Sequence, residues 1–126
     1  MKTYTIEETK CTPSISLDPS GVISLSGRSF PENTFKFYTP MMEWLEEYFE
    51  NSPAEKTVVS LNIIYINSSS SRQFFDFFDL LEENCEEHKI EISWIYDEGN
   101  DSGLEAGEDY QDDFPNLNIK LVEKPN

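Results

Sequence analysis

The chain has 126 residues, enough for one domain that buries a core without metal ions or disulfide bonds. Hydrophobic residues make up 37% and aromatic residues 13%, which argues for a packed globule rather than a disordered acidic polymer. Nine basic against 25 acidic residues give a net charge of −16, which excludes a nucleic-acid-binding surface and opposes contact with anionic membranes. We expect residues 1–126 to form a single domain.

The two cysteines, Cys11 and Cys85, are isolated and lack the spacing of a metal or redox motif. We interpret both as free thiols in a reducing compartment. The first residues are polar rather than typical of a signal peptide, and no apolar run approaches the roughly 20 residues that cross a bilayer. We therefore expect a cytoplasmic protein, without a cofactor or a bound metal.

The first predicted elements are a β-hairpin and a helix. Residues 15–17 and 22–25 alternate with period two around a turn at 18–21. Pro31 then suits the first turn of a helix, because proline lacks the amide that would stay unpaired there. Apolar residues recur at helical spacing between Tyr38 and Phe49, and Pro40 predicts a kink or a break in this helix.

The second half alternates strands and helices. Residues 57–66 form the strongest strand, with both faces apolar, which predicts a central position in a sheet. A helix follows, then a strand at 90–96, an acidic stretch at 97–113 with a short helix, and an edge strand at 117–121. The order β-β-α-β-α-β predicts an α/β fold: a mixed sheet of four or five strands, right-handed crossovers, and helices packed on it.

Four serines, Ser68 to Ser71, lie where the central strand is followed by a helix. Functional sites in open α/β sheets collect at such junctions, and the free amides and the dipole of a helix N-terminus favour an anion. A phosphate of charge about −1.5 to −2 could be held by those amides and by Arg72. Helix capping is the alternative, since Ser70-x-x-Gln73 has the spacing of a capping box. The spacing alone leaves both interpretations open.

The chain resembles the SiaC family, STAS-like bacterial phosphoproteins that regulate a diguanylate cyclase. Four segments in the family's order carry this resemblance, and the second and third are the most specific. They are Thr12-Pro13 with Ile15; Gly27-Arg28-Ser29-Phe30-Pro31-Glu32-Asn33, followed by Phe37-Tyr38 and Trp44; Tyr65-Ile66-Asn67-Ser68-Ser69-Ser70; and Trp94-x-Tyr96-Asp97 with the downstream Gly107-Glu108.

The resemblance implies a phosphorylation switch at Ser68, a position where the family usually has threonine. A dedicated kinase would phosphorylate it, a PP2C-type phosphatase would reverse this, and the unphosphorylated form would bind and activate the cyclase in c-di-GMP signalling and biofilm control. Capping geometry also tolerates phosphate on Ser69. We predict a partner-binding surface around the switch: Arg28, Ser29, Phe30, Glu32, Asn33, Asn67, Ser69, Ser70 and Arg72.

Several alternatives accompany this hypothesis. Arg28 could form a surface ion pair with Glu32 rather than contact a partner or clamp the phosphate, and turn chemistry also explains Phe30, Glu32 and Asn33. An adaptor like an anti-sigma-factor antagonist would share the fold and the switch but bind another protein.

Catalysis and calcium binding are further alternatives. Catalysis would need His88, the single histidine, as the base for a nucleophile, and no nucleophile elbow is present, so we expect no enzyme. A calcium loop beginning at Asp97 would place Asp101 and Glu108 correctly, but Gly99 and Ser102 break its pattern.

Overall fold

The computed structural model describes residues 1–51 and 53–125. It contains a six-stranded sheet whose strands lie side by side in chain order. The first two pairs are antiparallel and the last three are parallel. The strands are β1 Tyr4–Ile6, β2 Ser14–Asp18, β3 Val22–Ser29, β4 Lys56–Ile66, β5 Lys89–Asp97 and β6 Ile119–Lys124. The helices are α1 Thr34–Glu50, α2 Ser68–Asn84 and α3 Asp101–Asp113.

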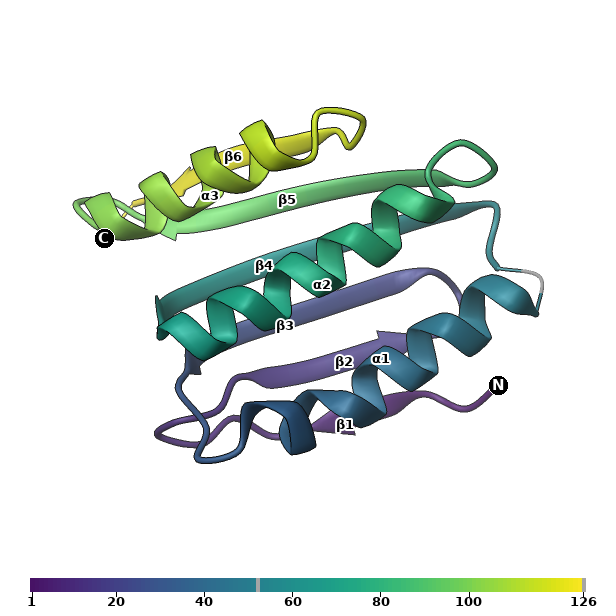
Figure 1. The fold of residues 1–126 in the computed structure, drawn as a ribbon, viewed down its shortest axis with the longest axis horizontal. Coiled ribbons are helices and arrows are strands. Elements are labelled where there is room, and N and C mark those ends of the chain that lie inside the picture. The colour runs from purple at the N-terminus through teal and green to yellow at the C-terminus, as the bar shows by residue number, and fades with distance from the viewer. Residues whose placement is uncertain (52, 126) are drawn as a thin grey trace.

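All three helices cover the same face of the sheet (Figure 1). Each of them joins a parallel strand to the next one along, always in the same direction, and right-handed crossovers then place every helix on one side. Along β4, buried residues therefore alternate with half-buried ones such as Val58 and Ser60, which face away from the helices. The predicted central position of this strand is confirmed, since β4 lies between β3 and β5, although the helices cover only one of its faces.

The predicted α/β class, with a mixed sheet and helices packed on it, is confirmed. The sheet has six strands rather than four or five, because the short β1 pairs with β2 at one edge. The acidic stretch forms a helix of thirteen residues. None of the described helices is long and apolar enough to span a membrane.

The first helix differs from its prediction at Pro31, and it has no break at Pro40. It begins at Thr34, after the N-cap Asn33, and not at Pro31. It also continues through Pro40. Proline has no amide hydrogen, so the carbonyl one turn before Pro40 lacks its usual hydrogen bond within the helix. Because Pro40 is exposed, water can bond this carbonyl, and the helix tolerates the missing hydrogen bond.

The core between sheet and helices is rich in aromatic rings. Trp94 of β5 lies at its centre, 1% exposed, with the rings of Phe74, Phe78 and Tyr110 at centroid distances of 6.5, 6.4 and 5.4 Å. Its indole Nε1 donates to the carbonyl of Gly103 at 2.9 Å. Burial of each such ring stabilises the fold by roughly 1.5–3 kcal/mol, and this cluster fixes α3 against β5.

A substitution at Gly107 would test how closely α3 packs on the sheet. A Cβ atom at this position would lie 2.5 Å from Cδ1 of Trp94 and 2.7 Å from Cδ2 of Leu121, both in strands beneath α3. We expect Gly107→Ala to lower the free energy of unfolding by about 1–3 kcal/mol, measured by urea denaturation, because the added methyl overpacks the core. The exposed neighbour Glu108 provides the control, Glu108→Ala; equal losses in both variants would contradict the close approach.

Candidate functional site

The amino ends of the three helices lie along one border of the sheet, the edge formed by the carboxyl ends of the parallel strands (Figure 1). Each helix has an asparagine N-cap: Asn33, Asn67 and Asn100 accept hydrogen bonds from the amides of the third residue that follows. Because helix dipoles place partial positive charge at these ends, this edge favours an anion. Asn67, and not Ser70, caps α2, so the capping-box interpretation of Ser70-x-x-Gln73 was wrong.

Three of the four serines connect the first turn of α2 to its neighbours. The Ser69 hydroxyl bonds Thr34 Oγ1 at the start of α1, at 2.9 Å. Ser70 is fully buried and accepts a hydrogen bond from Ser29 Oγ of β3 at 2.7 Å. The Ser71 carbonyl accepts one from the hydroxyl of Tyr110 of α3 at 2.9 Å. Hydrogen bonds on three sides therefore fix the position of this turn.

Ser68 is the remaining serine and the first residue of α2. It is exposed, and its hydroxyl forms no hydrogen bond with the described part of the chain. Ser70 is enclosed, while Ser69 and Ser71 are both engaged. Ser68 thus combines exposure with a free hydroxyl at the positive end of a helix, which suits a phosphate acceptor.

The other residues of the predicted partner surface divide into two groups. Arg28, at the end of β3, pairs in register with Tyr65 of β4, which places it at the same edge as Ser68. It forms no ion pair with Glu32 in the described structure, so that alternative is absent here. Direct contact with a partner fits the exposed members and does not fit the buried Ser29 and Ser70. The exposed members are Arg28, Phe30, Glu32, Asn33, Ser69 and Arg72, and Asn67 is half-buried.

Exposed aromatic residues around Ser68 were missed in part by the sequence analysis. Phe35 in the first turn of α1 is 76% exposed and Tyr65 is 53% exposed. Tyr65 packs edge-on against Phe30, with ring centroids 5.7 Å apart. The register of β3 with β4 shifts at Gly27/Arg28, so that Arg28 pairs with Tyr65 and Ile64 is left over as a β-bulge. We call Phe30, Phe35 and Tyr65 the aromatic rim; exposed apolar groups of this kind mark interaction surfaces.

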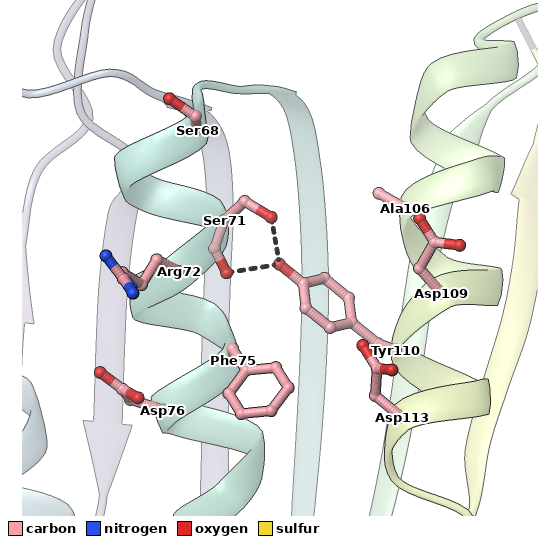
Figure 2. Close-up of a pocket in the computed structure, with 9 residues that line it drawn as sticks. All are labelled: Ser68, Ser71, Arg72, Phe75, Asp76, Ala106, Asp109, Tyr110 and Asp113. Atoms are coloured by element: carbon pink, nitrogen blue, oxygen red, sulfur yellow. Dashed lines mark hydrogen bonds between the residues drawn. The ribbon is translucent and has the colours of Figure 1, made fainter.

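A groove of about 640 Å³ runs along the α3 side of α2 from Ser68. Figure 2 shows Phe75 pointing between the two helices, with Tyr110 reaching across to Ser71. Asp109 and Asp113 line the groove from α3. The lining residues are Ser68, Ser71, Arg72, Phe75, Asp76, Ala106, Asp109, Tyr110 and Asp113.

Comparison with known proteins identifies the family of this chain. The model of the SiaC family of regulatory phosphoproteins matches residues 6–124. The chain belongs to the SiaC family. The predicted family is thus confirmed, and the site lies inside the matched region.

Relatives from Pseudomonas aeruginosa agree. An uncharacterised protein of strain UCBPP-PA14 is 32% identical over 116 residues, covering 87% of this chain and 90% of the relative. The solved structure of SiaC is 26% identical and superposes with a TM-score of 0.84 over all of both chains. A chain in the crystal structure of the diguanylate cyclase SiaD in complex with its activator SiaC is 27% identical, with a TM-score of 0.87 over 96% of this chain and 99% of that one.

The structure disfavours the serines as nucleophiles activated by His88. His88 follows α2, whose 17 residues separate it from Ser68 by about 25 Å, and its ring lies 5.7 Å from that of Phe49. At this distance His88 cannot act as a base for the serines.

The calcium alternative fails on conformation. Asp101 and Glu108 both lie within α3, so the ligand loop that a calcium site requires is not formed. Among the described residues, no group of three or more acidic, histidine or cysteine side chains is arranged to hold a metal ion.

Removal of the buried hydroxyl at Ser70 tests the connections of α2. Ser70→Ala removes one of the two buried partners of the Ser29 hydroxyl, the other being the hydroxyl of Tyr38, and we expect a loss of about 1 kcal/mol in the free energy of unfolding by urea denaturation. Ser69→Ala, which removes an exposed hydrogen bond, is the matched control and should cost much less. A loss no larger than that of the control would show that the buried bond does not position α2.

The tyrosines beside the site predict an alkaline sensitivity. Burial raises the pKa of Tyr38 and of Tyr110 from 10.0 to about 12. The folded state therefore holds both protons more tightly than the unfolded chain, and this stabilisation is complete below pH 10 and is lost as the pH rises towards 12. We expect the denaturation midpoint to fall over this range, and to fall less in Tyr38→Phe; an identical pH dependence in both proteins would contradict the assignment.

Proposed function

We propose that this chain is a non-catalytic partner-switch protein of the cytoplasm. Its unphosphorylated form binds and activates a diguanylate cyclase, and phosphate on Ser68 abolishes this binding. The exposed, unbonded hydroxyl of Ser68 at the start of α2 is the observation that carries the proposal. The family consists of regulatory phosphoproteins, and SiaC, a relative of the same fold, is the activator of the diguanylate cyclase SiaD.

The surroundings of Ser68 would stabilise a phosphate once it is attached. The amides of Ser68 and Ser69 precede the first hydrogen bond within the helix, which the amide of Ser71 makes with the carbonyl of Asn67. Arg72 lies four residues further, on the same side of α2, and has no ion pair within the described chain. Phosphorylation would therefore cost the fold little.

The same phosphate would strongly oppose a partner that covers this edge. The aromatic rim supplies an apolar contact surface beside Ser68, and a partner seated on it would exclude water from the serine. Taking the charged phosphate out of water, in an interface where the partner brings no further cation to it, costs several kcal/mol, which is on the order of a thousandfold in affinity. One modification is thus sufficient to switch binding off.

A kinase and a PP2C-type phosphatase complete the proposed cycle, which would control c-di-GMP synthesis and biofilm formation. Both enzymes must reach Ser68, and its exposure permits this. Serine presents the same hydroxyl as the threonine that is usual in the family but lacks its methyl group. The kinase of this system would therefore accept a primary alcohol.

The switch is tested by mass spectrometry and by binding. Protein purified from its host should carry a single phosphate on Ser68 that a PP2C phosphatase removes. In isothermal titration calorimetry with the cognate cyclase, Ser68→Ala should bind like the wild type, and Ser68→Asp should bind at least about tenfold more weakly.

The control places the same charge elsewhere. Ser20 is exposed in the turn between β2 and β3, at the opposite edge of the sheet, and Ser20→Asp should leave the affinity unchanged. Wild-type affinity in Ser68→Asp, together with an unmodified serine run in the host under every growth condition, would refute the proposal.

A further inference from the structure

Negative charge is concentrated on the helical side of the molecule. The helices α1, α2 and α3 carry four, four and six carboxylates, more than half of the 25 acidic residues of the chain. Only Lys36 and Arg72 oppose them within these helices. The side that faces a partner across the groove is therefore strongly electronegative, and α3, with no basic residue, is its most acidic part.

The α2–α3 groove adds an apolar contact to this charge. Asp109 and Asp113 are four residues apart on α3, hence on one side of the helix, and both are exposed. Neither forms an ion pair within the described structure. Beside them Phe75 stays 44% exposed although its ring packs against Phe114 at 4.8 Å. The groove thus joins an open aromatic ring to unneutralised carboxylates.

We infer that the groove binds a cationic segment of the cyclase, with an arginine side chain stacked on Phe75 and hydrogen-bonded to Asp109 and Asp113. A guanidinium matches both features, because it is planar, stacks on aromatic rings and donates in pairs to carboxylates. A lysine would match only the charge. This inference rests on the proposed function, since it assigns a second contact to the same partner.

The groove and the aromatic rim would then have different kinetic roles. Exposed charges of opposite sign accelerate encounter and are screened by salt, whereas apolar contacts mainly set the lifetime of a complex. Phosphate on Ser68 adds negative charge at the end of the groove, so attraction of a cationic segment persists in the phosphorylated chain. The two groove aspartates should therefore govern the association rate, and Phe75 together with the state of Ser68 the dissociation rate.

The test is to measure both rate constants for the full-length chain and its cognate cyclase. At about 50 mM salt, Asp109→Asn combined with Asp113→Asn should lower the association rate constant about tenfold, and the difference should shrink at about 500 mM. Phe75→Ala should raise the dissociation rate constant. Glu86→Gln combined with Glu87→Gln removes the same charge in the exposed turn that follows α2, and should change the association rate constant less than about twofold.

Each outcome has one meaning. If the wild type does not bind the cyclase at all, the proposed function fails. If it binds, and the groove variant associates as fast as the control variant at low salt, the inference fails and the proposed function stands. Unfolding curves of the two charge variants should coincide with that of the wild type within about 0.5 kcal/mol, because the changed aspartates and glutamates are exposed; a folded variant with unaltered rates overturns the groove assignment.

Discussion

Each of the strands β3, β4 and β5 is followed by a helix that must cover apolar side chains on that strand and on the next. A right-handed crossover puts the helix on one particular face of the sheet. Because the three crossovers follow one another in the same direction, α1, α2 and α3 lie on the same face. Their amino ends then meet at one edge, where the Asn33, Asn67 and Asn100 caps lie. The positive electrostatic character of this edge is thus a consequence of chain topology and does not depend on the serines.

The serine run serves two purposes that depend on each other. Ser69, Ser70 and Ser71 hold the first turn of α2 to α1, β3 and α3, and their hydroxyl or carbonyl groups are used up in doing so. A rigid turn keeps the amides at its start aligned, which is what an attached phosphate needs. Ser68 can then remain free of internal bonds without loss of local order. The exposed serine is in this way separated from the serines that maintain the structure.

The hairpin, the central strand and the position of the serines were predictable from sequence, because alternation, turn residues and helix-start chemistry are local signals. The third helix was underestimated, since two of its buried residues, Gly103 and Gly107, carry no hydrophobic signal. The roles of Tyr38 and Tyr110 were not predictable, because each meets its serine partner only after distant elements pack. The exposure of Tyr65 depends on the register shift between β3 and β4, and this shift could not be predicted from the alternation of hydrophobic residues in the sequence.

The order of the strands along the sheet, which equals their order along the chain, also bears on how the molecule assembles. Every strand pairs with the strand before it, so no loop longer than one connecting helix has to close. Low loop-closure entropy of this kind favours rapid, stepwise growth of the sheet during synthesis. Tyr110, however, reaches Ser71 only when α3 has docked near the end of the chain. The first turn of α2 is therefore held by α1, β3 and α3 together only in a chain whose last helix has docked.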